Sequence, residues 1–275
     1  MIPSRGRPGY LEVCLASVAP QAEAAGAEVI VVNDGGDDAA ATDRIGHRHG
    51  AQVISPTAPG GVNAGRNAGL QAAAADLIVL IDDDVQAPPG WLEAILAGAR
   101  AAPGAGVFGG PIRARLEGHS LRACGRESPP ITTLDLGPVD RDVALVWGAN
   151  MAVRRSALKL AGGFDETISG RGDEEDWERR YAARGGVVRY LADAGLDHRR
   201  TAPDSTLRAL ARAAYGQGRD ARRYDVRRGS RPSLPAELRT LVGCAWHVFR
   251  RRCANGVVMG APAAGRLREA LAGRG

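Results

Sequence analysis

Hydrophobic runs and Ala-rich stretches alternate along the first two thirds of this 275-residue chain. The apolar runs are short and rich in β-branched residues, and they predict strands at Glu28–Val32, Gln52–Ser55, Leu77–Ile81, Gly106–Arg113, Val143–Val153 and Val187–Leu191. Apolar residues at helical spacing predict helices at Gly9–Val18, at Asn63–Ala75 and from Pro89 onward. The alternation favours an α/β fold with a mainly parallel sheet flanked by helices.

The two ends of the chain depart from this alternation. Met1–Pro3 leaves almost no first strand before the loop Ser4–Pro8. Beyond residue 200 the apolar residues recur at helical spacing, and the turn-rich segment Arg228–Pro235 interrupts them. We therefore predict one domain over residues 1–200 and a small helical region over residues 201–275.

The net charge of +5 is unevenly distributed along the chain. Residues 199–275 contain 17 Arg, no Lys and 5 acidic residues, a net charge of +12, so residues 1–198 carry a net charge of −7. Acidic and basic side chains are therefore segregated between the two predicted parts.

Several classes of protein are disfavoured by composition. No segment approaches the roughly 20 apolar residues of a membrane-spanning helix, and Met1–Tyr10 has Arg, Pro and Gly where a signal peptide needs an apolar stretch. We therefore expect a cytoplasmic protein. Cys14, Cys124, Cys244 and Cys253 lack the paired spacing of a zinc site or a disulfide framework, so we expect reduced cysteines that serve in packing.

Three consecutive acids, Asp82, Asp83 and Asp84, follow directly on the predicted strand Leu77–Ile81. The carboxyl ends of strands are where open α/β sheets bind ligands. Like charges so close together are unfavourable unless a cation lies among them, and a divalent cation that also binds substrate phosphates satisfies this requirement. A solvated acidic turn is the alternative interpretation.

Two further segments indicate a nucleotide site. Asp34 ends another predicted strand and is followed by two glycines, which allow a ligand close to the backbone. The Gly-rich segment Gly60–Gly69 opens a predicted helix that carries Arg66, and helix amino termini and guanidinium groups both favour phosphate. Between two acidic strand ends, we interpret Arg66 as a partner for a diphosphate.

A fourth segment is acidic and lies later in the chain. Gly162–Glu166 is followed by Gly172–Tyr181, in which a helix is predicted to begin near Asp173. The positive end of the helix dipole stabilises ionised acids in the first turn. Such a carboxylate is either an ordinary feature of a helix start or a general base for a hydroxyl group.

Taken together, the motifs resemble glycosyltransferase family 2, the inverting enzymes with the glycosyltransferase type A fold. The resemblance covers residues 1 to about 200 and rests on seven motifs in the family's order: Pro3-Ser4-x-x-Arg7, Asn33-Asp34-Gly35, Gly65-Arg66-Asn67-x-Gly69, Asp82-Asp83-Asp84, Gly148-Ala149-Asn150-Met151, Gly162-Gly163-Phe164-Asp165-Glu166 and Glu175-Asp176-x-Glu178. It implies a nucleoside-diphosphate sugar donor, a hydroxyl acceptor, a divalent metal (Mn²⁺ or Mg²⁺) and a single displacement at the anomeric carbon.

The resemblance also implies roles for individual residues. The donor is expected to contact Pro3, Ser4, Asp34, Arg66, Asp82 and Asp83. The metal is expected to bind Asp84 and Asp82, with His198 as a further ligand after the last core strand. Asp176 is the expected catalytic base and Glu175 the second choice. The acceptor or sugar is expected to contact Trp147, Asn150 and Trp177.

Two other function classes remain as alternatives. A sugar nucleotidyltransferase could share an acidic metal site, but it is expected to have a Gly-rich basic loop after its first strand, and Ser4–Pro8 contains one glycine. A nucleic-acid-binding protein would use the Arg-rich C-terminal region, but its acidic cluster would repel phosphate. We therefore favour glycosyl transfer and expect no nucleic-acid partner.

The segment Ala236–Ala254 has two open interpretations. Its apolar residues follow helical spacing, and Arg250–Arg252 comes near its end. The apolar face could pack on the catalytic domain with the arginines in solvent. It could also lie on an anionic membrane surface, which would bring the enzyme to the inner face of the membrane as a peripheral protein.

Overall fold

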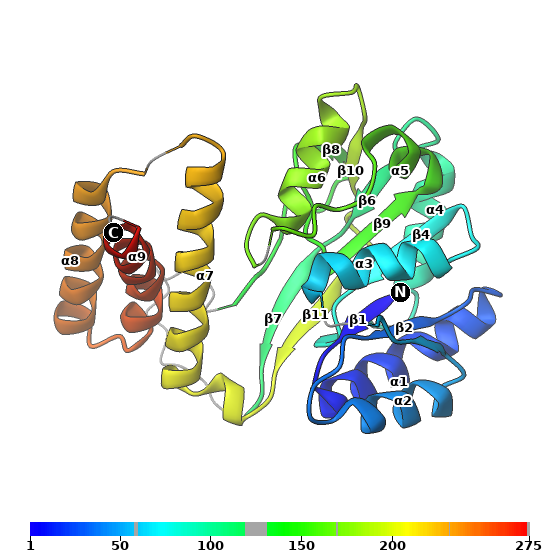
Figure 1. The fold of residues 1–275 in the computed structure, drawn as a ribbon, viewed down its shortest axis with the longest axis horizontal. Helices are drawn as coiled ribbons and strands as arrows, with labels where there is room; N and C mark the ends of the chain where they lie inside the picture. The colour runs from blue at the N-terminus through cyan, green and yellow to red at the C-terminus, as the bar shows by residue number, and fades with distance from the viewer. Residues whose placement is uncertain (58–59, 119–130, 169, 231, 274–275) are drawn as a thin grey trace. The chain divides into compact units, whose positions relative to one another are not determined.

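The computed structural model describes residues 1–57, 60–118, 131–168, 170–230 and 232–273 (Figure 1). The chain divides into two compact units. The first comprises Met1–Arg113, Thr133–Thr167 and Asp173–His198, and the second comprises Ala114–Thr132, Ile168–Gly172 and Arg199–Gly275.

The first unit begins with a parallel three-stranded sheet. The strands β1 (Ile2–Ser4), β2 (Ile30–Asn33) and β3 (Gln52–Ile54) are adjacent in that order. The connecting helices are α1 (Pro8–Ala24) and α2 (Ala39–Arg48), and α3 (Gly61–Ala72) follows β3. Every residue of β2 is buried, which explains its unbroken apolar run up to Asn33. Although the sequence left almost no room for a first strand, the three residues of β1 pair with β2.

A mixed five-stranded sheet completes the centre of this unit. Its strand order is β4 (Leu77–Ile81), β9 (Asn150–Arg154), β6 (Val107–Gly109), β10 (Val188–Tyr190) and β8 (Arg141–Val143). β9 lies antiparallel between β4 and β6, so the α/β fold is as expected but the sheet is mixed. The unit also contains the helices α4 (Trp91–Ala101), α5 (Arg155–Ala161) and α6 (Asp173–Ala182).

A small third sheet joins distant parts of the sequence. Its order is β5 (Val85–Gln86), β11 (Leu196–Arg200) and β7 (Ile112–Leu116). β11 runs antiparallel to β5, with His198 opposite Val85. Since β5 directly follows the acidic triplet, this pairing brings His198 next to Asp84.

Most predicted elements are present with shifted ends. Leu77–Ile81 forms a strand over its full predicted length, and the helices predicted from Gly9, Asn63 and Pro89 correspond to α1, α3 and α4. The runs Gly106–Arg113 and Val143–Val153 each split, because a turn and a loop interrupt them, into β6 and β7 and into β8 and β9.

An aromatic stack anchors α6 to the core. The Trp177 ring lies between those of Phe164 and Tyr181, with centroid distances of 5.3 and 5.6 Å. Trp177 is fully buried, and its indole N–H donates to the Gly162 carbonyl over 2.7 Å. Each aromatic pair contributes about 0.5–1.5 kcal/mol beyond burial, so the stack holds the rotation of α6 about its axis.

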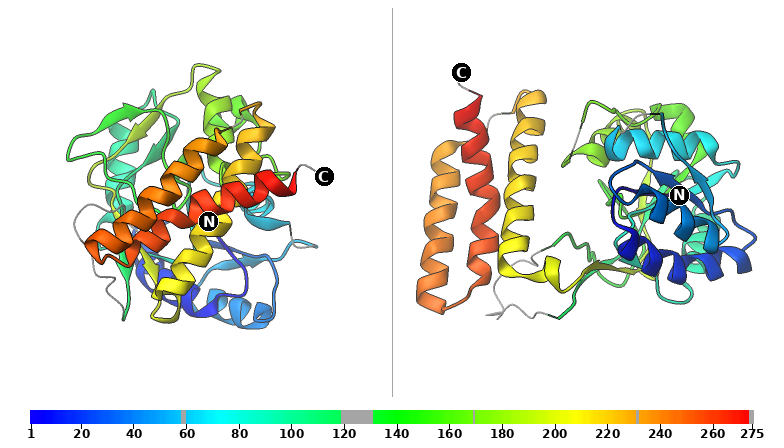
Figure 2. Two further views of the ribbon diagram at one scale, coloured as in Figure 1. Left: turned by 90° about the vertical axis from the view of Figure 1, so that its left-hand side faces the viewer. Right: turned by 60° about the horizontal axis from the view of Figure 1, so that its bottom comes forward.

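The second unit contains the short 3₁₀ turn η1 (Pro203–Ser205) and the helices α7 (Leu207–Arg227), α8 (Leu234–Arg251) and α9 (Asn255–Ala272). α9 lies between α7 and α8 and packs against both (Figure 2). Gly218 and Gly265 permit the close approach of α7 and α9, because a Cβ at either position would collide with a backbone carbonyl. Among the described helices, none is sufficiently long and apolar to cross a membrane.

The cysteines do not form a cluster in the described residues. Cys14, Cys244 and Cys253 are free thiols, and Cys14 and Cys253 are buried. Burial raises the pKa of the Cys14 thiol, whose Sγ donates to the Asp82 carbonyl over 3.6 Å. Cys124 lies outside the described residues.

Candidate active site

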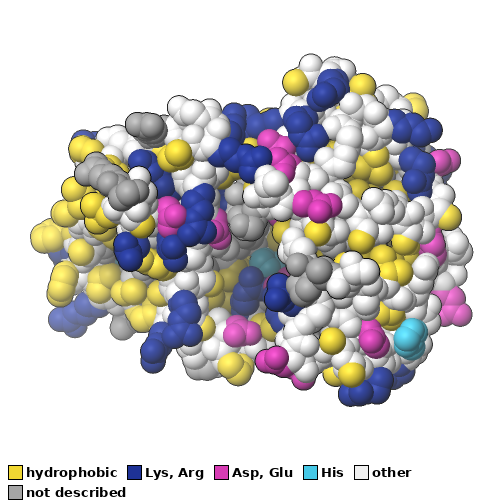
Figure 3. Space-filling model, in the orientation of Figure 1, with side chains coloured by type: hydrophobic (Ala, Val, Ile, Leu, Met, Phe, Trp, Pro, Cys, Tyr) yellow, Lys and Arg dark blue, Asp and Glu magenta, His cyan; other side chains and the backbone are white. Residues whose placement is uncertain are grey.

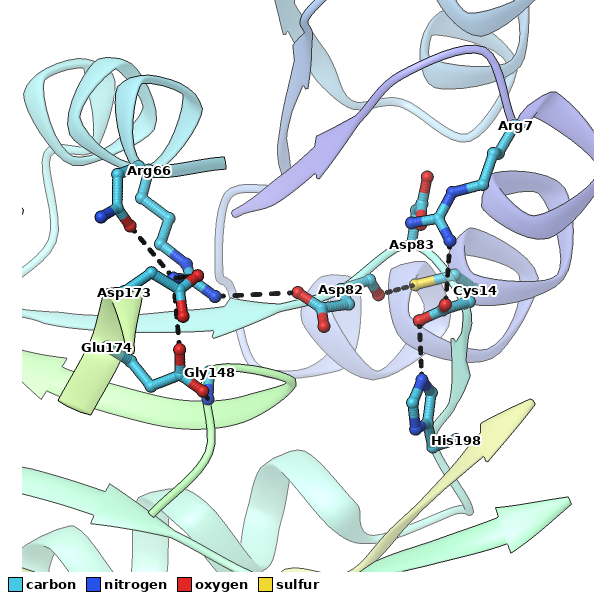
Figure 4. Close-up of polar contacts among 11 residues, drawn as sticks. Arg7, Cys14, Arg66, Asp82, Asp83, Gly148, Asp173, Glu174 and His198 are labelled. Atoms are coloured by element: carbon cyan, nitrogen blue, oxygen red, sulfur yellow. Dashed lines mark hydrogen bonds and ion pairs between the residues drawn. The ribbon is translucent and has the colours of Figure 1, made fainter. Parts of the chain in front are cut away.

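The acidic triplet lies at the end of β4, with Asp82 directed toward Arg66 and Asp83 toward Arg7 (Figure 4). Asp83 is fully buried and accepts a 2.8 Å hydrogen bond from the Ser4 hydroxyl. The Asp82 side chain is one third exposed, whereas that of Asp84 is buried. Asp83 and Ser4 therefore fasten β4 to β1, and Asp82 keeps solvent access.

Arg7 is a resident cation at this cluster. It precedes α1, and its guanidinium donates to both Asp83 and Asp84, the latter over 2.9 Å. The Arg7 side chain remains 44% exposed, so it can leave the carboxylates without disturbing the core. Its place in the Pro3-Ser4-x-x-Arg7 motif was the sequence signal for this position.

His198 approaches Asp84 from β11. Its Nε2 lies 3.4 Å from Asp84 Oδ1, and both side chains are buried. This arrangement follows from the pairing of β11 with β5. The two residues are 114 positions apart in the sequence, and the third sheet brings them together.

The side chains around Asp84 are of the kinds that bind a divalent cation together with a phosphate. Within the described residues, no three acidic, His or Cys side chains are gathered closely enough to form a complete protein cage. A carboxylate and an imidazole are nevertheless suitable ligands for Mn²⁺, and Mg²⁺ keeps open positions for phosphate oxygens. Partial burial and the neighbouring charge of Asp84 raise the pKa of Asp82, so a cation here would relieve the repulsion between the two carboxylates. Asp84 and His198 therefore suit two positions in the coordination of such a metal.

Asp34 holds the start of α3 in place. Its carboxylate accepts hydrogen bonds from the backbone N–H groups of Gly60 and Gly61, over 2.9 and 3.3 Å. Arg5 lies 3.6 Å from the same carboxylate. Asp34 is buried beside β1, so Ser4 and Pro3 lie on the strand next to it.

Arg66 is a buried cation surrounded by acids. Its guanidinium lies 2.7 Å from Asp173, 3.8 Å from Glu174 and 4.0 Å from Asp82 (Figure 4). Gly148 makes room for it, because a Cβ there would collide with the guanidinium. Arg66 thus joins the end of β4 to the start of α6.

The Gly162–Glu166 motif is hydrogen-bonded to α3. Asn67 exchanges two hydrogen bonds with the Phe164 backbone, each 2.9 Å long. Asn63 donates to the Asp165 carbonyl over 2.9 Å and accepts from Arg66. The motif therefore positions Arg66, and the Phe164 ring lies 5.5 Å beneath its guanidinium.

Sequence reasoning assigned no role to two acids of α6 that lie beside Arg66. Asp173 pairs with Arg66, and Glu174 accepts a 3.3 Å hydrogen bond from the Gly148 N–H. Burial and the neighbouring Asp173 raise the pKa of Glu174, whereas the Arg66 charge lowers that of Asp173. Two adjacent carboxyls whose pKa values are pushed apart are typical of acid–base sites.

Asp176 and Glu175, the two acids expected to be catalytic, have basic partners on their own helix. Asp176 pairs with Arg180 over 2.9 Å, and Glu175 pairs with Arg179 over 2.7 Å. Arg180 also donates to the carbonyls of Ala161 and Gly163, so Asp176 supports the turn before α6. A signal was present in the sequence, since these two acids have Arg four positions on, whereas Asp173 and Glu174 do not.

The side chains expected at the acceptor have different surroundings. Asn150 is buried, accepts from Trp91 over 3.0 Å and donates to the Pro111 and Ala194 carbonyls, so its amide is fully used in the core. Trp177 is likewise a core residue. Trp147, next to Gly148, is half-buried, and its indole N–H has no hydrogen-bond partner among the described residues. Of the three, Trp147 remains our candidate for a ligand contact.

Glu178 is another buried carboxyl in α6. It accepts a 2.9 Å hydrogen bond from the Val146 N–H, and burial raises its pKa to about 8. It is therefore mainly protonated at neutral pH and cannot accept a proton there.

Comparison with known proteins decides the family. Residues 1–161, more than half of the chain, match the glycosyl transferase family 2 model. The chain belongs to glycosyltransferase family 2. The acidic end of β4 and Arg66 lie within the matched residues.

The curated relatives are glycosyltransferases. A pre-mycofactocin glycosyltransferase of Mycobacterium tuberculosis is 33% identical over 200 residues, which cover 70% of this chain and 41% of the relative. A glucosyl-dolichyl phosphate glucuronosyltransferase of Haloferax volcanii is 24% identical over 149 residues, 50% of this chain and 48% of that protein. The chain thus spans less than half the length of these relatives.

Solved structures show the same fold. The mannosyltransferase PcManGT from Pyrobaculum calidifontis, in complex with GDP-Man and Mn²⁺, has a TM-score of 0.63 at 17% identity, covering 97% of this chain and 85% of that chain. TarS residues 1–349 of S. aureus has a TM-score of 0.53 at 17% identity, with 78% of this chain and 63% of that chain covered. These likenesses support the glycosyltransferase type A fold.

Proposed function

We propose that this glycosyltransferase moves a sugar from a nucleoside-diphosphate donor to an acceptor hydroxyl, with a divalent metal and inversion of the anomeric carbon. The observation that carries the proposal is the position of Arg66, between Asp82 and the acids that begin α6. A guanidinium there can bind a diphosphate while one carboxylate beside it faces an acceptor. Family membership and a neighbour that binds GDP-Man and Mn²⁺ support the same reaction.

The nucleoside end of the donor belongs beside β1 and β2. Asp34 has carboxylate lone pairs beyond those used by Gly60 and Gly61, and these can accept hydrogen bonds from a base. Pro3 and Ser4 lie on the adjacent strand and can form the wall of this part of the pocket.

The diphosphate end belongs at the end of β4. Asp84, Asp82 and His198 would hold the metal, and a bound divalent cation stabilises the negative charge of a leaving diphosphate. Arg66 contributes a fixed positive charge close to Asp82. Because it is buried and held by Asp173, it requires little reorganisation when the donor binds.

We assign proton removal to Glu174, in place of the expected Asp176. Its carboxylate is oriented by the Gly148 N–H and lies beside Arg66, whereas the Asp176 carboxylate is paired with Arg180. The charge of Arg66 favours the ionised form of Glu174, which is the form that can accept a proton. As Glu174 takes the acceptor's proton, the acceptor oxygen forms its bond to the anomeric carbon and the diphosphate leaves from the opposite side. A single displacement of this kind inverts the configuration.

A thermal-shift screen tests the donor class. Each nucleoside diphosphate is added with Mn²⁺ and with EDTA, and we expect one of them to raise Tm by about 5 °C or more only with the metal. Nucleoside monophosphates serve as the control, because they lack the second phosphate. If no diphosphate stabilises the protein, or if the same shift occurs in EDTA, the proposed donor or its metal dependence is wrong.

Pre-mycofactocin and glucosyl-dolichyl phosphate are the first acceptors to try, because relatives are named for them.

Arg7 provides a second prediction. Because the Arg7 guanidinium is paired with the Asp84 carboxylate, Arg7→Gln is expected to tighten Mn²⁺ binding in the absence of nucleotide by about fivefold to tenfold. Calorimetry or Mn²⁺ electron paramagnetic resonance measures this directly. Arg5→Gln is the matched control, because Arg5 lies beside Asp34 instead of the triplet. Weaker Mn²⁺ binding in Arg7→Gln would show that Arg7 supports the site and does not compete for it.

A further inference from the structure

An apolar stripe runs along the exposed side of α8. Leu238, Val242, Trp246 and Phe249 have exposed fractions of 53, 69, 67 and 80%. With about 100° of rotation per residue, the four side chains fall within an arc of about 80°. No residue of Leu234–Arg251, all of which the structure describes, is buried. The stripe is therefore one continuous surface that the fold of this unit does not use.

A different face of α8 makes the helix contacts. Leu241, Cys244 and Val248 lie on the side toward α9, where they line an apolar groove of about 510 Å³. The groove floor on α9 is built of small residues such as Gly256 and Gly260. The stripe is therefore additional to the packing face, and a soluble surface seldom exposes so many large apolar groups together.

The stripe and the groove adjoin each other. Ala245 lines the groove, and its helical position lies at the edge of the stripe. Figure 3 shows hydrophobic side chains gathered over α8 and α9, with basic side chains around them. The apolar surface therefore extends beyond a single helix face and includes a recess.

The arginines of α8, together with Arg252 just after it, carry uncompensated positive charge. Arg239, Arg250, Arg251 and Arg252 are exposed, and within the described part of the chain none of them forms an ion pair. The acids on the three long helices of this unit pair with arginines of α7 and α9, in the ion pairs Arg223–Asp220, Arg266–Asp225, Arg266–Glu237, Arg219–Glu269 and Arg223–Glu269. By helical position, Arg239 and Arg250 flank the Trp246 side of the stripe.

We propose that α8 is an interfacial helix that binds an anionic lipid bilayer. The stripe enters the boundary between headgroups and acyl chains, and the arginines contact lipid phosphates. Trp246 and Phe249 are suited to this region, since aromatic residues favour the membrane interface. Mobile acyl chains can also fill the irregular groove, and the four free guanidinium charges select a negative surface. This inference goes beyond the proposed reaction and holds whichever donor the enzyme uses.

Vesicle flotation of the full chain tests the proposal. We expect the protein to float with vesicles of phosphatidylcholine and phosphatidylglycerol at low salt, and to stay behind with phosphatidylcholine alone or in 0.5 M salt, because the attraction is partly electrostatic. Trp246→Glu/Phe249→Glu is expected to weaken binding by at least about 100-fold. Val139→Glu is the matched control, because Val139 is 66% exposed in the other unit. Arg250→Gln/Arg251→Gln is expected to weaken binding by roughly 30-fold.

Fluorescence gives a second readout that does not depend on flotation. Trp246 is exposed, whereas Trp91 and Trp177 are buried and Trp147 is half-buried in the other unit, so lipids brominated on the acyl chains should quench mainly Trp246. This quenching should be lost in Trp246→Phe while flotation is retained. Absence of flotation and quenching with anionic vesicles overturns the proposal. A second outcome also overturns the proposal. In it the parent forms a concentration-dependent dimer, the Trp246→Glu/Phe249→Glu variant is a monomer, and vesicle binding is the same in both, because the stripe would then join two copies.

Discussion

Glu174→Gln is expected to lower sugar transfer by about 100-fold or more, while donor affinity stays within about twofold. The amide can still accept the hydrogen bond from the Gly148 N–H, but it cannot take a proton from the acceptor. The donor contacts assigned to Asp34, Arg66 and the triplet are unchanged. The loss should therefore appear in kcat, and donor binding measured by calorimetry should be preserved.

Asp176→Asn is the matched control for this substitution. It weakens an i, i+4 ion pair with Arg180 that is partly exposed, so a modest loss of stability of about 0.5 kcal/mol is expected. Activity measured at a temperature well below Tm should stay within about threefold of the parent. If Asp176→Asn is inactive and Glu174→Gln retains near-normal kcat, then the base is Asp176, as the sequence motif first indicated.

Asp84→Asn is expected to weaken metal-dependent donor binding by at least about 100-fold. The carboxylate faces His198 on one side, and its replacement by an amide removes the negative charge that a hard cation requires. The affinity for the metal–nucleotide complex is measured by calorimetry in Mn²⁺ and in EDTA. His198→Gln should produce a smaller loss of about tenfold, because it removes a neutral ligand.

Asp142→Asn controls for the loss of one negative charge, because Asp142 is an exposed residue paired with Arg189. Its donor affinity should equal that of the parent. Folding is checked by Tm, since Asp84→Asn also removes a partner of Arg7. Equal donor affinity in Asp84→Asn and the parent would show that the metal does not bind at the end of β4.

The site residues that directly follow a strand were predictable. The strand can be recognised from its own apolar residues, and ligands bind at the carboxyl ends of strands. Leu77–Ile81 is an apolar run bounded by Asp76 and Asp82, so its limits and the position of the triplet could be read directly. The same holds for Asp34, which follows the buried β2. Arg66 was recognised from the Gly-rich start of its helix, although only the structure shows that Gly148 and Phe164 shape its pocket.

By itself the sequence determined the alternation of strands and helices, the helical C-terminal region and the order of motifs, because these depend on residues close together in the chain. Tertiary structure decided that β9 runs antiparallel, and the pairing of β11 with β5 brought His198 to Asp84. It also decided which acids of α6 face Arg66. The stack around Trp177 sets the rotation of that helix, and this rotation directs Asp173 and Glu174 toward Arg66.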